Sequence, residues 1–274
     1  MKYKIEHNSV EETLILPLYA RYIAELKYPN LKGNRNTKNI IDSIDYDFKS
    51  KEKKMTSKIG LYGTLECIQR EYDLKCEILD YLNKYPYASV VNLGCGLLDI
   101  YIEIDNKKCS VYNIDFESVI NVRNKLIPLR DREINIASDL NDYSWMDKIN
   151  KDNGVIFIAA GVFYYFKRDD AKKLFLEISK RFTNSSLVFD TCNKKGLKLM
   201  LKTWLKEAGI KDVGAYFGLS KPKKELDLMQ IPYKNMSIKS YMHGYRKLKY
   251  IFIHKICNII MDKIVKGRII RLDF

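Results

Sequence analysis

The hydrophobic and polar positions change their period near residue 86. Before it, Ile68, Leu79 and Leu82 recur at helical spacing, and this pattern stops at a Tyr-Pro pair, where proline disfavours a helical conformation in the residue before it. From residue 89 onward, short β-branched runs alternate with amphipathic segments. The change predicts an N-terminal helical cap with a leading helix over residues 1–85 and an α/β core over residues 86–274.

Short runs of apolar, β-branched residues in the second part predict strands, and the segments between them predict helices. The expected strands are residues 89–93, 110–114, 133–137, 155–159 and 187–189. The expected helices, with apolar residues at three- and four-residue steps, are residues 117–127, 169–182 and 195–208. This alternation is typical of a parallel, doubly wound sheet. A helix over 247–264 and a last strand over 268–273 fit a seven-stranded, mostly parallel sheet with one reversed strand.

Composition indicates a protein that folds around its own core. The chain has 274 residues, of which 46% are hydrophobic, and can bury a sizeable core. Its longest apolar stretch, residues 155–163, is about half of what a bilayer-spanning helix needs, and its first residues are charged. The charged run over residues 49–54 is expected to be a surface loop. We expect a soluble, cytoplasmic protein with no membrane partner.

Neither the cysteines nor the histidines have the spacing of a metal site. The six cysteines include no Cys-x-x-Cys pair, and His7, His243 and His254 are scattered, so we expect reduced thiols and no bound metal. The formal net charge of +14 suits an anionic partner, but charge alone more often serves solubility. No nucleic-acid partner is expected, and the sequence does not indicate an oligomeric state.

The segment with the clearest chemistry is a strand that runs directly into two glycines, residues 90–97, VVNLGCGL. Glycine lets the backbone turn sharply and approach a ligand closely, as in nucleotide-binding turns. A dinucleotide fold has a third glycine where this chain has Asp99, which disfavours a nicotinamide dehydrogenase. Asp115 ends the next strand, where a carboxylate can accept both ribose hydroxyls, although capping of the following helix is an alternative role. Asp139 follows the third strand and taken alone is an ordinary turn residue.

Four sequence blocks then resemble the leucine carboxyl methyltransferase family, especially its bacterial polyketide O-methyltransferase branch. They are residues 92–97 (NLGCGL), 112–120 (YNIDFESVI), 142–147 (DYSWMD) and 157–166 (FIAAGVFYYF). The resemblance extends over residues 65 to 195 and more loosely beyond. It implies a class I, Rossmann-like methyltransferase that takes S-adenosylmethionine as cofactor. The implied reaction is O-methylation of a carboxylate or hydroxyl of a small molecule.

The resemblance also implies where the cofactor is held. The expected cofactor-binding residues are Arg70, Gly94, Cys95, Gly96, Asp115, Phe116, Asp139, Leu140 and Ala160. Arg70 would bind the methionine carboxylate, since a guanidinium pairs with a carboxylate through two parallel hydrogen bonds. Asp115 would hold the ribose, Phe116 would flank the adenine, and Asp139 with Leu140 would meet its edge. Arg21 has two interpretations, a ligand contact from the cap or a solvated helix charge, and the second is favoured.

Methyl transfer from a sulfonium needs alignment more than acid or base chemistry, because the electrophile already carries a positive charge. Tyr164 and Tyr165 follow the fourth strand, where they can line an acceptor pocket or pack under the cap, and we take Tyr165 as a candidate catalytic residue. His243 is the histidine placed to act as a base, or it is structural.

Two positions depart from the family pattern and support an alternative function. The family has an acidic residue where this chain has Ala160, and Leu-Asp-Thr-Arg where this chain has residues 97–100, LLDI. The alternative is a catalytically degenerate cofactor-binding or regulatory protein of the same fold. Nucleic-acid methylation is disfavoured, since residues 159–162 lack the Asn/Asp-Pro-Pro-aromatic segment that clamps a base amine.

Overall fold

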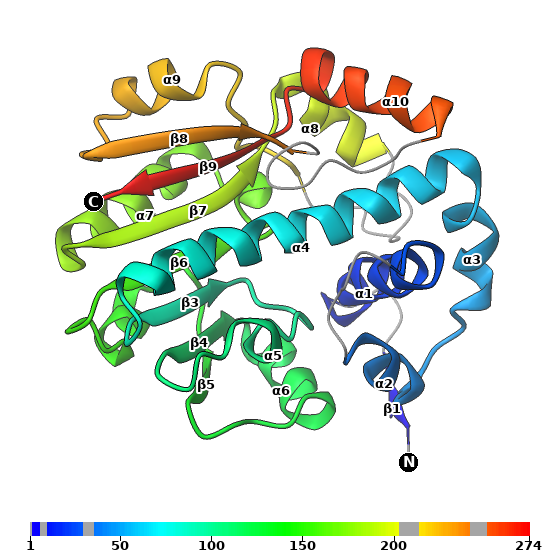
Figure 1. Cartoon of the computed structure of the whole chain (residues 1–274), viewed down its shortest axis with the longest axis horizontal. Helices are drawn as coiled ribbons and strands as arrows, with labels where there is room; N and C mark the ends of the chain where they lie inside the picture. Colours follow the sequence, from blue (N-terminus) through cyan, green and yellow to red (C-terminus); the bar gives the residue numbers. More distant parts are fainter. Residues whose placement is uncertain (1, 6–9, 30–35, 203–213, 242–250) are drawn as a thin grey trace.

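The structure is a computed structural model, and it describes residues 2–5, 10–29, 36–202, 214–241 and 251–274. A seven-stranded sheet in the order β5-β4-β3-β6-β7-β9-β8 forms its centre (Figure 1). The strands are β3 (Ser89–Leu93), β4 (Ser110–Asp115), β5 (Glu133–Ala137), β6 (Val155–Ala159), β7 (Ser185–Thr191), β8 (Asn235–Ser240) and β9 (Arg268–Asp273). Only β9 runs against its neighbours, pairing antiparallel with both β7 and β8. The predicted doubly wound, mostly parallel sheet is confirmed.

The two faces of the sheet are buried under different helices. Side chains alternate along a strand, so Val91 packs with Trp145 and Phe175 on one face, while Val90 packs with Leu74 and Ile156 on the other. The first face is covered by η1 (Tyr143–Lys148), α7 (Arg168–Arg181) and α9 (Pro222–Leu228). The second face is covered by α4 (Lys58–Lys84), α5 (Tyr101–Ile104) and α10 (Phe252–Ile259). Burial on both faces explains why the central strands read as continuous apolar runs.

The remaining elements flank these layers. They are α6 (Glu117–Leu126), η2 (Phe163–Tyr165), α8 (Lys194–Met200) and η5 (Ile260–Val265), the last a π-helical turn that continues α10. None of the helices in the described residues is long and apolar enough to span a bilayer. The six cysteines are all unpaired, and the described residues contain no cluster that could hold a metal ion.

The N-terminal segment forms a separate hydrophobic cluster beside α4 (Figure 1). It comprises β1 (Tyr3–Lys4), α1 (Val10–Lys27), α2 (Thr37–Asp42), β2 (Ile44–Asp45) and α3 (Lys49–Met55). Ile15 and Leu18 of α1 pack in one cluster with Leu97 and Val122 of the core. The cap therefore contacts the core next to the glycine-containing segment that follows β3.

One predicted element needs correction, and two others lie partly outside the described residues. The charged run over residues 49–54 is helical, because Lys and Glu are good helix formers and Met55 is buried at the end of α3. The prediction of a surface loop there is wrong. The predicted helix over 195–208 is seen as α8, and its residues 203–208 lie outside the described part of the chain. Residues 247–250 of the predicted C-terminal helix over 247–264 lie outside it as well.

The aromatic core gives a test of the packing. The ring of Phe175 lies 5.0 Å from that of Phe163 and 5.3 Å from that of Phe189, and it is fully buried. Phe175→Ala should lower the free energy of unfolding by about 3–5 kcal/mol, because it leaves a cavity among packed rings. The exposed control Leu228→Ala should stay within about 0.5 kcal/mol of the wild type. Equal urea midpoints for the two variants would contradict this packing.

Candidate cofactor site

The bend after β3 depends on glycine at two positions. Gly94 and Gly96 have positive φ angles of 61° and 47°. A Cβ at Gly94 would lie 2.6 Å from Cγ2 of Val162, so any side chain there would collide with the loop that follows β6. A Cβ at Gly96 would meet only Leu14 of the cap, at 3.4 Å, so its φ angle is what favours glycine. The bend thus brings backbone close to β6 and to α1.

Asp115 joins the end of β4 to this bend. Its Oδ2 accepts a hydrogen bond from the Gly96 N–H at 2.9 Å, and its Oδ1 accepts one from the Phe116 N–H at 2.8 Å. The Cys95 N–H donates to the Ile114 carbonyl at 3.1 Å, so strand pairing and side chain both tie the two strand ends together. Burial raises the pKa of Asp115, although the two backbone donors oppose the shift. The predicted convergence of bend and acid is therefore found in the structure.

Two buried arginines bind the carbonyls of the bend. Nη1 of Arg123 donates to the carbonyls of Gly96 at 3.1 Å and Leu98 at 2.8 Å, and Nη2 of Arg21 donates to the carbonyl of Leu97 at 3.2 Å. Three successive carbonyls thus accept from guanidinium groups. Fully buried Arg123 is balanced by Glu133, whose Oε1 lies 3.2 Å from its Nη2. The solvated role favoured for Arg21 is wrong, because its side chain is buried between cap and bend.

Asp99, which stands where a dinucleotide fold has its third glycine, has a structural partner. Its buried carboxylate accepts from Arg130 at 2.8 Å and 2.6 Å, and Asn36 of the cap donates to it at 2.6 Å. The segment after the bend forms the short helix α5. A different start of this helix from the family pattern stays a prediction.

A second polar centre lies where β6 and β7 end. Asp190, at the end of β7, accepts from the Gly161 N–H at 2.6 Å and the Tyr164 hydroxyl at 2.9 Å. The same carboxylate pairs with Nη1 of Arg70 at 3.2 Å. Gly161 has a φ of 72°, and a Cβ there would lie 2.8 Å from Nη1 of Arg70, so glycine makes room for the guanidinium. Arg70 is thereby fixed beside the loop that carries Ala160.

The other predicted cofactor residues differ in what they present. The Phe116 ring is 53% exposed beside Asp115, and Asp139 is exposed with its Oδ1 bonded to the Asn141 N–H at 2.8 Å. Cys95 and Leu140 are buried, so only their backbone can meet a ligand. The β5 end is joined to Asp115 through the Ser138 N–H, which donates to the Asp115 carbonyl at 2.9 Å. The adenine role of Asp139 and Leu140 stays a prediction.

The predicted catalytic residues have unequal support. Tyr165 is 41% exposed, and its partial burial raises its pKa, with the charge of Arg70 opposing the shift. Tyr164 is buried and donates to Asp190, and burial raises its pKa well above the usual value. His243 lies outside the described residues. Tyr165 is therefore available to a ligand, while Tyr164 is part of the Asp190 centre.

Sequence reasoning missed Asp190 and Arg123. Asp190 follows the apolar residues of β7 as Asp115 follows those of β4, so its place near a strand end was a usable signal. Arg123 gave none, because a basic residue in an amphipathic helix is normally solvent-exposed.

Buried carboxylates accumulate around Arg21. Glu71 lies 3.6 Å from Nε of Arg21, and neither of its oxygens has a hydrogen bond within the described part of the chain. Burial raises the pKa of Glu71 to about 7, with Arg21 opposing the shift. Burial also raises the pKa of Glu25 to about 7. The carboxyl groups of Glu25 and Glu71, at the contact between α1 and α4, are therefore protonated at slightly acidic pH.

This predicts a pH dependence of stability. The folded chain holds the Glu71 proton more tightly than the unfolded chain, so the stabilisation is complete below about pH 4.5 and is lost as the pH rises through about 7. The glutamine of Glu71→Gln cannot ionise. The unfolding free energy of this variant should therefore decline between pH 4.5 and 8 by on the order of 3 kcal/mol less than that of the wild type. The exposed control Glu52→Gln should decline like the wild type. Urea unfolding at several pH values measures this, and parallel curves for all three proteins would contradict it.

Solved structures with the same fold include a candidate methyltransferase from Thermobifida fusca. It has a TM-score of 0.61 and 12% identity, and the alignment covers 89% of this chain and 95% of that one. The plantazolicin methyltransferase BpumL, solved in complex with SAH, has a TM-score of 0.52 and 16% identity, with 96% and 98% covered. The fold is therefore that of the class I, Rossmann-like methyltransferases.

Sequence comparison points to one family within that class. The leucine carboxyl methyltransferase family model matches residues 78–179, which include β3 to β6. The tetracenomycin polyketide synthesis O-methyltransferase TcmP of Streptomyces glaucescens is 24% identical over 192 residues, or 68% of this chain and 67% of that protein. The resemblance to the leucine carboxyl methyltransferase family is confirmed, and the chain is a relative of S-adenosylmethionine-dependent methyltransferases.

Proposed function

We propose that this protein binds S-adenosylmethionine over the ends of β3, β4 and β6 and transfers its methyl group to an oxygen of a small molecule. The observation that carries the proposal is the hydrogen bond between Asp115 and the Gly96 N–H, which puts a carboxylate beside a glycine bend. In open α/β sheets, ligands bind in the crevice at the carboxyl ends of the strands. The class of reaction, methyl transfer, is proposed from the methyltransferases that this chain resembles.

The residues at the site fit the two ends of this cofactor. Asp115 would accept from the ribose hydroxyls, with Phe116 exposed alongside for the adenine. Arg70 would bind the methionine carboxylate. Its Nη1 is bonded to Asp190, while its Nε and Nη2 make no hydrogen bond to the described residues and remain for a ligand. The bend of Gly94 and Gly96 would bring backbone close to the sulfur-bearing chain.

Bound there, the cofactor supplies a methyl group on a positively charged sulfur. The chain has to align the acceptor oxygen and exclude water. The ion pair with Asp190 fixes the Arg70 guanidinium, and the cap contact of Leu14 at Gly96 covers the bend.

The acceptor is proposed to be a carboxylate or hydroxyl of a small molecule. TcmP is named as an O-methyltransferase of polyketide synthesis, which favours oxygen as the acceptor atom. A carboxylate is already ionised near neutral pH, whereas a hydroxyl needs a base, and the raised pKa of Tyr165 makes it a poor one. Alkali treatment of the methylated product separates the two, because it cleaves a methyl ester and leaves a methyl ether intact.

The second candidate is a cofactor-binding protein without catalysis. Ala160 leaves the loop after β6 without the acidic residue of the family, which favours this alternative. The Asp190 carboxylate bonds to the Gly161 N–H, so a negative charge is nevertheless present next to position 160. This observation makes the enzyme the stronger proposal.

Removing Asp115 should weaken binding of the whole nucleoside. Asp115→Ala should raise the dissociation constant of S-adenosylhomocysteine roughly five- to a hundredfold, because paired ribose hydrogen bonds are lost. The affinity for 5′-methylthioadenosine, which keeps the ribose but lacks the amino-acid part, should fall equally. Calorimetry measures both, and Asp152→Ala, an exposed acid away from the bend, is the control. Unchanged affinity of Asp115→Ala would show that the ribose is bound elsewhere.

Removing Arg70 should affect only one of those two ligands. Arg70→Met should raise the dissociation constant of S-adenosylhomocysteine roughly tenfold to a hundredfold, since a charge-assisted hydrogen bond is lost. Affinity for 5′-methylthioadenosine should be retained, which also shows that the variant is folded. Arg70→Lys should be intermediate, because lysine keeps the charge without the planar fork. Equal losses for both ligands would place Arg70 away from the methionine carboxylate.

A further inference from the structure

The solvent-facing side of the C-terminal helix is apolar. Over α10 and η5 the exposed positions follow the helical period, and they are Phe252, Lys255, Ile256, Ile259, Ile260, Lys263 and Ile264. Phe252 is 79% exposed, Ile259 61% and Ile264 51%. We call this set the α10 face. Single exposed apolar residues are ordinary on a protein surface, but five on one helical face mark an interaction site.

The opposite side of the same helix is held by hydrogen bonds of two buried polar residues, beside Cys257, Met261 and Val265, which pack against the core. His254 is buried with its Nε2 2.9 Å from the Lys58 carbonyl, and the Tyr62 hydroxyl donates to Oδ1 of buried Asn258 at 2.9 Å. Polar side chains thus help to anchor the helix on α4, while four of its isoleucines and Phe252 are exposed. The usual surface helix keeps such large apolar residues on its inner side, so these five are left for contacts outside the described fold.

Charge on the α10 face favours an anionic occupant. Lys255 and Lys263 lie on it among the apolar residues, and both are exposed, with Nζ of Lys263 3.7 Å from Oδ2 of Asp262. The acidic neighbour Asp262 is turned toward Arg268, at 2.8 Å, and accepts from the Ser240 hydroxyl at 2.9 Å. The chain as a whole carries a formal charge of +14. A basic helix with one apolar side is the pattern of helices that lie in the plane of a membrane surface.

We propose that the α10 face docks this protein on an anionic membrane surface, with the helix lying in the plane of the headgroups. The helix of residues 252–265 is roughly 20 Å long at the usual rise per residue, enough for all five apolar side chains to enter one interface. It lies at the periphery of the molecule, where a flat surface can reach it (Figure 1). A second copy of the chain fits less well, because a two-fold contact would bring the same lysines together.

This inference is independent of the proposed catalytic function and revises the sequence-based expectation that no membrane is involved. It also has a structural link to the site, since α10 is anchored on α4, the helix that carries Arg70. Docking through the α10 face would hold one end of α4 at the membrane.

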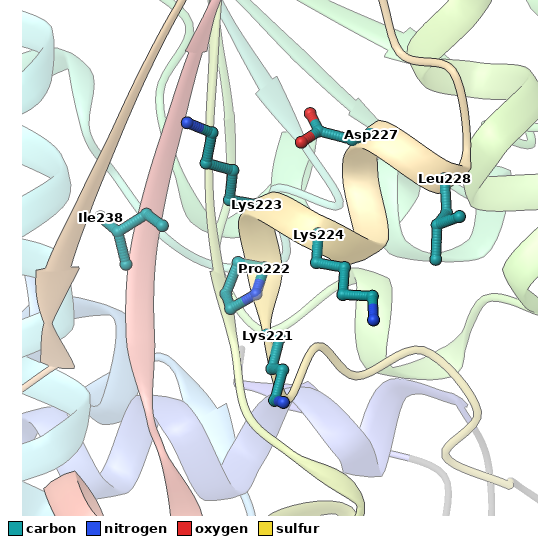
Figure 2. A pocket seen from close by; sticks show the side chains of 7 residues that line it. All are labelled: Lys221, Pro222, Lys223, Lys224, Asp227, Leu228 and Ile238. Atoms are coloured by element: carbon teal, nitrogen blue, oxygen red, sulfur yellow. The ribbon is translucent and has the colours of Figure 1, made fainter.

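A second basic surface of the protein provides a matched control. Lys221, Lys223 and Lys224 of the α9 region line a hollow with Leu228 and Ile238 (Figure 2). Leu228 is 71% exposed, yet it is not part of a continuous apolar helical face. Substitutions there change the charge and the exposed apolar area without changing the α10 face.

Sedimentation with phospholipid vesicles tests the proposal on the full chain. Wild type should bind vesicles of phosphatidylcholine and phosphatidylglycerol mixed in a 3:1 ratio. Its binding to pure phosphatidylcholine vesicles should be weaker by roughly tenfold or more, which is the difference expected from two lysines near an anionic surface. Ile256→Gln with Ile259→Gln should weaken binding to the anionic vesicles roughly tenfold or more, because apolar burial is lost. Two control variants, Leu228→Gln alone and Lys223→Glu combined with Lys224→Glu, should bind the anionic vesicles more tightly than the isoleucine double variant and more nearly like the wild type. All these positions are exposed, so the variants should fold normally.

Three results would overturn the proposal. The first is absence of binding to the anionic vesicles. The second is equally strong binding by Ile256→Gln with Ile259→Gln, since net charge alone would then account for the attraction. The third is a wild-type dimer in sedimentation velocity that this variant abolishes, which would assign the α10 face to a second copy of the chain.

Discussion

The ends of β3 and β4 are held together by one side chain, and the proposed site depends on it. The Asp115 carboxylate accepts the N–H of Gly96, so the glycine bend and the acid become a single rigid unit. Burial raises the pKa of that carboxyl, which means that its surroundings are poorly solvated and that each hydrogen bond to it counts for more. The bend's own carbonyls are fixed by Arg123 and Arg21. Buried charged side chains thus fix this short loop, which is expected where a loop must be preorganised to bind a ligand.

The order of the strands explains why the site can have two ends. β3 lies between β4 and β6, so its bend has Asp115 on one side and the loop of Gly161 on the other. Asp190 lies near the end of β7, the next strand along the same edge of the sheet, and it fixes Arg70 there through an ion pair. A ligand with a nucleoside at one end and a carboxylate at the other matches this arrangement, because the two recognition groups are charged side chains fixed on different strands. The loss of the acid at position 160 is partly offset by the Asp190 carboxylate at the neighbouring Gly161.

Much of the fold could be predicted from the sequence, because buried strands leave a direct record. The predicted strands at residues 133–137, 155–159 and 268–273 agree with β5, β6 and β9; β6 is a continuous apolar run, and β5 and β9 combine isoleucines with polar residues. The site could be predicted where motif and strand end coincide, as at Gly96 and Asp115. Arg123 could not, because its burial depends on Glu133 from β5, and no local pattern carries a tertiary ion pair. The exposure of the isoleucines of α10 could not be predicted either, since an apolar pattern does not show which of its residues face inward.

The central claim is that the bend with Asp115 and the guanidinium of Arg70 bind the two ends of one molecule. A crystal structure of the protein with S-adenosylhomocysteine tests it most directly. The account predicts the ribose hydroxyls within hydrogen-bonding distance of Asp115 and the amino-acid carboxylate on Nε and Nη2 of Arg70. A ligand bound elsewhere, or bound at the bend with its carboxylate away from Arg70, would contradict it.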